Sequence, residues 1–226
     1  MSDVTEDSVR HEKAPGTGLL TRLHQEWVEV LAAVLLALAT VASAWSAYQA
    51  ARWRSQESMA FNEANAARVH AAEAYDLADT DTDIDVAMFI AYFNALWAGE
   101  TETVRLYEER LFREEMRHAV LAWKAADPVH NPNAPANPFV MPEYRNANRE
   151  EARSLEGEAR AKAEEAREAI RNSDFYVLFT VLFAAVLFFA GICTKLKAAA
   201  LRIAVLFMGV ALFLGSFIVM SFQPVL

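Results

Sequence analysis

The amino-acid sequence predicts an all-α fold in which three transmembrane helices carry a long, coiled-coil-like helical stalk between the first and the second. Three observations support this fold class. Apolar residues concentrate in the blocks 30–51, 175–193 and 203–222, each long enough to cross a bilayer as a helix. The chain between the first two blocks repeats alanine at helical spacing. Hydrophobic residues make up 54% of the sequence, which is high for a soluble domain.

The predicted segments follow from these blocks. A cleaved signal peptide is not expected, because residues 1–26 are polar, mixed in charge and lack a short apolar segment. The first span is therefore predicted to remain as a permanent anchor. In chain order the segments are a polar N-terminal tail (1–26), a first span (27–51), an acidic helical stalk (52–172), a second span (173–194), a basic loop (195–202), a third span (203–222) and a short tail (223–226).

Aromatic and basic residues mark the two ends of the first span. Trp27 precedes it, and Trp45 and Tyr48 lie near its end, so roughly 27–32 Å of helix separates them, close to the apolar thickness of a bilayer. Tryptophan and tyrosine favour the interface between lipid and water. We therefore predict that Trp27, Trp45, Tyr48, Arg52 and Trp53 lie at the membrane interface. A ligand cage and a packing role between subunits are the alternatives.

Two alanine seams run along the stalk. From Ser46 to Ala78, small or apolar residues recur in alternating steps of four and three, interrupted at Glu57, and a second seam runs from Ala152 to Ile170. Alanine buries little area, and burial stabilises by only about 25 cal/mol per Å². We therefore expect several helices, or the subunits of an oligomer, to share the seam.

The middle of the stalk allows two topologies. Residues 83–126 are predicted as a second helical block, and the prolines of an extended linker, 127–142, exclude a helix there. In the preferred arrangement the chain turns near Thr82, the block returns toward the membrane as one helix, and the linker climbs back to start a third helix near Pro142. In the alternative, Gly99 marks a reversal, the middle is a short hairpin and the linker stays at the tip.

Charge predicts the sidedness of the stalk. The loop 195–202 holds Lys195, Lys197 and Arg202 with no acidic residue, and the positive-inside rule places such a loop in the cytoplasm. The N-terminus is then cytoplasmic, and the stalk and the C-terminus are extracytoplasmic, although Arg52 and Arg54 favour the opposite orientation. The stalk is acidic, so nucleic acid is not an expected partner.

Four segments of the chain resemble a known group of proteins. They are ATVASAWSAYQAARW, FIAYFNALWAGE, AWKAADPVHNPNAPANPFVMPEY and YVLFTVLFAAVLFFAGI, in this order. Together they are similar to an uncharacterised family of bacterial integral membrane proteins of about this length, and the similarity covers most of the chain from the first span to the second. The resemblance implies a multi-pass protein of the bacterial inner (plasma) membrane. The family has no established activity, so it implies no functional residues.

An acidic run provides weak candidates for a metal site. Asp79, Asp81 and Asp83 lie at alternate positions, as at the start of a calcium-binding loop. Such a loop needs glycine where Ile84 stands and a bidentate glutamate where Ile90 stands, so the match fails twice. We favour a turn between helices whose aspartates cap the next helix, with a weak calcium site as the alternative.

Glu115 and His118 form the other weak metal candidate, because their spacing is that of helical di-iron bundles. We favour a solvated face of mixed charge for these residues. No phosphate loop or nucleophile motif is visible, so the sequence predicts no catalytic residues, no cofactor and no enzymatic activity.

We therefore expect a self-associating membrane protein whose stalk serves as a scaffold or sensing module. Its expected partners are the lipid bilayer and further copies of itself. The alternative is a small homo-oligomeric, tension-gated (mechanosensitive) ion channel lined by the first span, with Ser43, Ser46 and Gln49 facing the pore. The second and third spans lack ionisable residues away from their ends, which argues against a proton pump.

Overall fold

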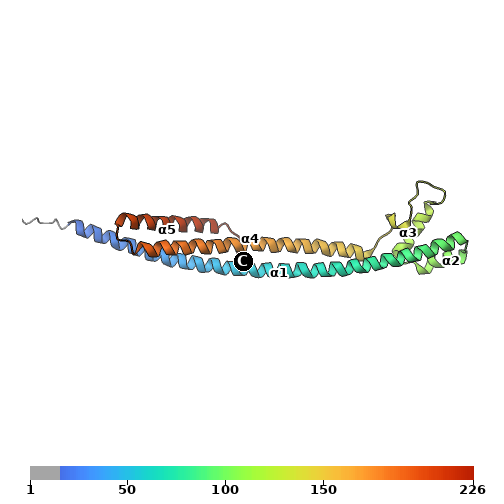
Figure 1. The fold of residues 1–226 in the computed structure, drawn as a ribbon, viewed down its shortest axis with the longest axis horizontal. Coiled ribbons are helices and arrows are strands. Elements are labelled where there is room, and N and C mark those ends of the chain that lie inside the picture. The colour runs from blue at the N-terminus through green and yellow to red at the C-terminus, as the bar shows by residue number, and fades with distance from the viewer. Residues whose placement is uncertain (1–15) are drawn as a thin grey trace, which may run out of the picture. The chain divides into compact units, whose positions relative to one another are not determined.

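The computed structural model describes the backbone of residues 16–226 and the side chains of residues 26–226, and this part is all-helical (Figure 1). Helices α1, α4 and α5 are each long and apolar enough to cross a membrane. The all-α class and the presence of three candidate spans are therefore confirmed. The elements are α1 (Gly16–Ala98), α2 (Thr101–Leu106), the π-helical turn η1 (Tyr107–Leu111), α3 (Glu114–Ala125), the 3₁₀ turn η2 (Pro138–Val140), α4 (Ala147–Cys193) and α5 (Ala199–Met220).

The chain divides into two compact units. Among the described residues, the span unit comprises 16–57 and 168–226, and the acidic unit comprises Ser58–Arg167. The acidic unit holds 12 Lys/Arg against 21 Asp/Glu, a formal net charge of −9. Helices α1 and α4 contribute residues to both units, whereas α5 belongs to the span unit alone.

The core of the span unit consists of small and medium apolar side chains from α1, α4 and α5. Small residues let helix backbones approach closely, which is the usual basis of helix packing in lipid. Gly209 of α5 shows how close this approach is, because an added Cβ there would lie 3.3 Å from both Leu35 Cδ2 and Phe189 Cβ. One buried cluster contains Val28, Ala32, Leu35, Ala39, Val186, Ala190, Cys193 and Leu206.

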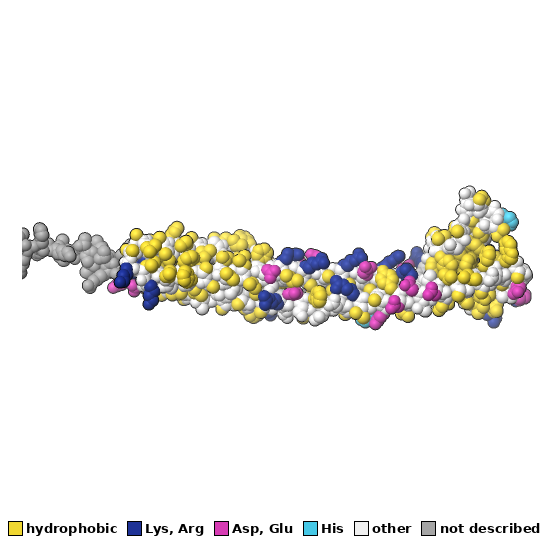
Figure 2. All heavy atoms as spheres, in the orientation of Figure 1, with side chains coloured by type: hydrophobic (Ala, Val, Ile, Leu, Met, Phe, Trp, Pro, Cys, Tyr) yellow, Lys and Arg dark blue, Asp and Glu magenta, His cyan; other side chains and the backbone are white. Residues whose placement is uncertain are grey.

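The outer surface of the span unit is apolar. Large side chains such as Val41, Phe188 and Phe207 are exposed, and Figure 2 shows hydrophobic side chains across the visible face of this unit. A soluble protein rarely exposes a continuous apolar surface of this kind. The composition of the surface therefore suits lipid as the surrounding medium.

In the acidic unit, α1 and α4 pack as an antiparallel pair. Contacts join Glu63 to Lys162 (2.8 Å), Tyr75 to Glu156 (3.4 Å) and Asp79 to Arg149 (2.6 Å). The partner's residue number falls as the α1 number rises, which defines the antiparallel direction. Ion pairs between exposed side chains add little stability, so the pair depends mainly on its buried seam.

The predicted alanine seams are the buried faces of these two helices. On α1, Ala60, Ala64, Ala67, Ala71, Ala74 and Ala78 are all buried, and on α4 Ala152, Ala159 and Ala166 are buried. The expected end of the second seam is wrong, because Ile170 is 39% exposed and the neighbouring Ala169 is buried instead. The seam is thus covered within one chain.

The preferred topology of the middle segment is wrong, because α1 does not turn near Thr82. The Thr82 hydroxyl donates to Ala78 O within an unbroken helix, and α1 continues to Ala98. The reversal comes at Gly99, whose φ is +75°. The amide of Gly99 donates to Leu96 O and that of Glu100 to Ala95 O, the hydrogen bonds of a Schellman motif. The predicted helix 83–126 is therefore divided among α1, α2, η1 and α3.

The third helix begins later than Pro142, at Ala147. Asn146 caps it, since its Oδ1 accepts a hydrogen bond from the Arg149 amide at 3.0 Å. The Nδ2 of Asn146 also donates to Ala78 O, so the cap ties α4 to α1. From there α4 runs as one helix to Cys193.

Candidate functional site

Residues 85–144, which we call the head, fold around a small cluster of aromatic side chains. The reversal at Gly99 brings α2, η1 and α3 back along the last turns of α1. Phe89 of α1 lies 5.2 Å from Trp123 and 5.7 Å from Phe139, ring centre to ring centre, in edge-to-face geometry. One buried apolar cluster of the head contains Tyr92, Ala95, Val104, Phe112, Met116 and Val120.

A buried ion pair fastens α3 to α1. Asp85 has a side chain only 2% exposed, and Arg113 binds it with two hydrogen bonds, Nε to Oδ1 at 3.2 Å and Nη2 to Oδ2 at 2.7 Å. The Tyr144 hydroxyl donates to the same carboxylate at 3.1 Å, and a further Arg113 nitrogen lies 3.1 Å from Asp81. The hydrogen bonds to Asp85 raise the pKa of Arg113, so the guanidinium stays charged.

A second polar group joins α1, η1 and α3. Glu108 accepts hydrogen bonds from the Tyr92 hydroxyl and from Lys124 Nζ, each at 2.7 Å. Burial opposes ionisation of Glu108, but these hydrogen bonds and the Lys124 charge outweigh it and lower the pKa of Glu108. Burial, together with the bond to Glu108, raises the pKa of Tyr92. Glu108 is therefore a charged acceptor and Tyr92 a neutral donor at neutral pH.

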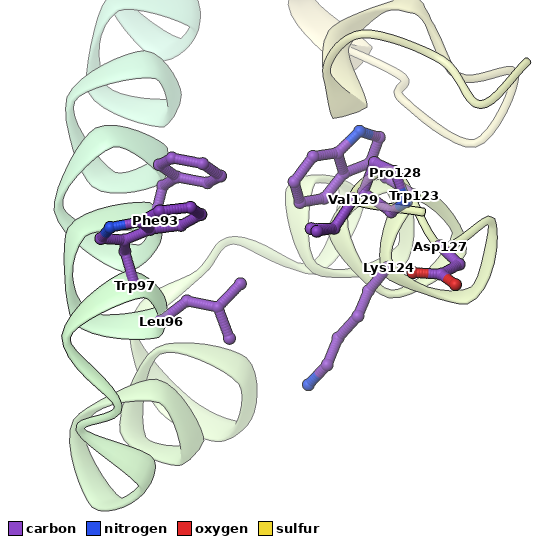
Figure 3. A pocket seen from close by; sticks show the side chains of 8 residues that line it. All are labelled: Phe93, Leu96, Trp97, Trp123, Lys124, Asp127, Pro128 and Val129. Atoms are coloured by element: carbon purple, nitrogen blue, oxygen red, sulfur yellow. The ribbon is translucent and has the colours of Figure 1, made fainter. Parts of the chain in front are cut away.

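An open cavity of about 290 Å³ lies beside the aromatic cluster of the head (Figure 3). Figure 3 shows Phe93, Leu96 and Trp97 of α1 along one wall, facing residues of α3 and the following loop. Trp97 is 78% exposed, whereas Trp123 on the opposite wall is buried and donates its indole N–H to Pro135 O at 2.9 Å. The opposite wall contains Trp123, Lys124, Asp127, Pro128 and Val129.

Two of the three residues predicted to line a pore are buried within the chain. The Ser46 hydroxyl donates to Ala42 O and lies 3.4 Å from Met220 Sδ. Gln49 forms two hydrogen bonds with the backbone of Leu226, one from Nε2 and one to Oε1. Ser43 is half-buried. The polar groups of Ser46 and Gln49 therefore stabilise the packing of α1 against residues 220–226.

The residues predicted at the membrane interface divide into an exposed group and one anchored residue. Trp27, Trp45, Tyr48 and Arg52 are exposed. Arg52 Nη1 lies 3.5 Å from the Tyr48 hydroxyl, and the rings of Trp45 and Tyr48 are 5.9 Å apart. Trp53 is half-buried and donates its indole N–H to Pro224 O at 3.3 Å. The exposed group has the side-chain chemistry of an interfacial belt.

The weak metal candidates do not come together. Asp79 pairs with Arg149, Asp81 accepts from Asn148 and contacts Arg113, and Asp83 is exposed. These aspartates lie along the middle of α1, so the turn whose next helix they were expected to cap does not exist.

Glu115 is half-buried and His118 is exposed, both on α3. Among the described residues, no group of three or more His, Cys, Asp or Glu side chains has the arrangement of a metal site.

No protein-family model, curated protein or solved structure matches this chain. The assignment of function therefore depends on the head and the spans themselves.

Sequence reasoning missed the pair Asp85–Arg113 and the cavity between Trp97 and Trp123. Both depend on the reversal at Gly99, since only a chain that folds back there brings α3 beside the end of α1. Gly99 was the available signal, because a glycine just past an apolar helix commonly adopts the left-handed conformation that ends it.

Proposed function

We propose that this is an integral protein of the bacterial inner membrane that presents the head as a recognition module, with a scaffold or sensing role. The observation that carries the proposal is the aromatic cavity of the head, beside the exposed ring of Trp97. Exposing a large aromatic ring to water is unfavourable, and such rings are enriched at binding sites. The apolar surface of the span unit supports the anchoring role.

The proposed orientation places the head and the C-terminus outside the cytoplasm and the N-terminus inside it. Lys195 and Lys197 in the loop between α4 and α5 support this orientation, and Arg202 lies in the first turn of α5. An outward acidic unit suits a module that meets external molecules, and its charge would repel anionic lipid.

Self-association is the second part of the proposal. Ala44 and Ala47 are exposed on α1, and small residues on the surface of a span let a second helix approach closely. The alanine seam of the acidic unit does not support self-association, since α4 of the same chain covers it. Native mass spectrometry of the protein from lipid nanodiscs should give two or more copies, and a monomer would contradict this part.

The channel alternative has less support. Its pore would need polar groups of α1 turned toward a shared axis. The Ser46 hydroxyl and the Gln49 amide instead form hydrogen bonds inside the chain. Reconstituted bilayers that conduct ions under tension would reverse this preference.

Photo-cross-linking in intact cells tests the recognition role. A benzophenone amino acid replaces Trp97 in the head or, as a matched control, Val69, which is also exposed on α1 but lies outside the head. We expect discrete cross-linked products from position 97 that are absent from position 69. Identical product patterns at the two positions, or none at position 97, would overturn the proposal.

A further inference from the structure

Three aromatic rings, those of Phe93, Trp97 and Trp123, line the cavity of the head. Trp97 and Phe93 stack with ring centres 6.4 Å apart, and Phe93 lies 6.4 Å from Trp123. The Trp123 N–H is already bonded to Pro135 O, so its ring contributes a face and no free donor. Aromatic faces carry partial negative charge and attract cations within about 6 Å.

The charges that line the cavity also favour a cation. Lys124 is the one basic residue among those lining it, and its ammonium is neutralised by Glu108 at 2.7 Å. Asp127 is the one acidic residue of the lining. The surrounding unit has a net charge of −9, and such a field concentrates cations near its surface.

The backbone holds Asp127 in an unusual conformation. Asp127 follows the C-cap of α3 with φ of +49°, a left-handed conformation usually adopted by glycine or asparagine. Its carboxylate contacts the ring of His130, at 2.9 Å, and both side chains are exposed, so an incoming group can reach the carboxylate.

We propose that the head cavity binds a small organic cation, a quaternary ammonium or an amine with an apolar body, with its charge near Asp127 and its body against Trp97 and Trp123. The volume of about 290 Å³ suits a ligand of this size. The ligand class goes beyond the proposed recognition role, because a head that binds a protein partner need not bind a free cation.

A pair of probes equal in shape and different in charge tests the proposal. Choline carries a trimethylammonium group, and 3,3-dimethylbutan-1-ol replaces its nitrogen with carbon. The full chain is labelled with 5-fluorotryptophan and titrated by ¹⁹F NMR in an uncharged maltoside detergent at pH 8. We expect choline to shift the signals of Trp97 and Trp123 but not that of Trp27, and the alcohol to shift none at the same concentration.

Three variants complete the experiment. Trp97→Ala and Asp127→Asn should each weaken choline binding roughly tenfold, the size of a cation–π or charge contact in a partly dry site. Both variants should fold, since Trp97 is exposed and asparagine tolerates the left-handed backbone. Leu121→Ala, which removes an exposed apolar side chain outside the cavity lining, should leave binding unchanged.

Equal binding of the two probes would overturn the proposal and identify the cavity as an apolar groove. Unchanged affinity in Asp127→Asn, or no shift of Trp97 at any choline concentration, would overturn it as well. None of these results would affect cross-linking at position 97, so the two proposals fail separately.

Discussion

Replacing Arg113 by methionine should destabilise the head, because it removes the charged partner of a buried carboxylate. The Asp85 side chain is only 2% exposed. Without Arg113, its carboxylate keeps the hydrogen bond from the Tyr144 hydroxyl. Removing one partner of a buried ion pair costs about 3–5 kcal/mol, because the other charge stays buried without compensation. Arg113 itself is 30% exposed, so water can reach the site and we expect about 3 kcal/mol.

Hydrogen exchange followed by mass spectrometry measures this loss. A loss of about 3 kcal/mol corresponds to roughly hundredfold faster exchange of head amides that exchange through unfolding of the head. The double variant Asp85→Leu/Arg113→Met should recover much of the protection, because it removes the buried charge along with its partner. Wild-type exchange in Arg113→Met, or faster exchange in the double variant than in the single one, would refute this reasoning.

Three further predictions concern the turn, the seam and pH. Gly99→Ala should lower the stability of the head by about 1 kcal/mol, because the φ of Gly99 is positive; the added methyl group meets no other atom. Gly157→Ala, inside α4, should instead raise stability by about 0.5–1 kcal/mol. Thermal unfolding of both variants measures the two effects. Ala64→Leu should overpack the buried seam and lower stability by about 1–3 kcal/mol without changing the subunit number. Ala66→Leu, on the exposed side of α1, should change neither the stability nor the subunit number. Loss of the oligomer in Ala64→Leu alone would contradict a seam that is covered within one chain. The lowered pKa of Glu108 stabilises the head at pH values above about 4.3, and this contribution is lost as pH falls through the folded-state pKa. Acid unfolding, followed by tryptophan fluorescence, should therefore be less steep in Glu108→Gln than in the wild type. Identical curves would contradict the prediction.

The sequence was sufficient to predict the elements whose signals are local. Three apolar blocks of spanning length predicted the long apolar helices, and the alternating steps from Ser46 to Ala78 predicted the buried face of α1. What covers that face could not be read from the spacing, because a heptad seam looks the same whether its partner is another chain or a later helix of the same chain. The contacts of Glu63 with Lys162 and of Tyr75 with Glu156 identify the partner as α4.

The topology of the head was mispredicted because two local signals competed. Asp79, Asp81 and Asp83 suggested a cap and a turn, but they lie within the unbroken helix α1, where Asp79 pairs with Arg149 and Asp81 with Arg113. Those partners lie far along the chain, so no local pattern reveals them. The helix ends at Gly99 instead, and the chain reverses there. The reversal brings together the two walls of the aromatic cavity.

The polar groups of α1 show the same limit. Ser46 and Gln49 have the composition of a pore lining, but Gln49 bonds to Leu226 and Ser46 contacts Met220, residues more than 170 positions later. A hydrogen bond between such distant residues has no local trace in the sequence.

Cysteine labelling in spheroplasts measures whether the head lies outside the cytoplasm on a three-span anchor. In a Cys193→Ser background, single variants Asn133→Cys in the exposed loop of the head and Lys197→Cys in the basic loop are exposed to a membrane-impermeant maleimide on spheroplasts. We expect labelling at position 133 in intact spheroplasts and at position 197 only after permeabilisation. Labelling at position 197 in intact spheroplasts, with position 133 protected until permeabilisation, would contradict it.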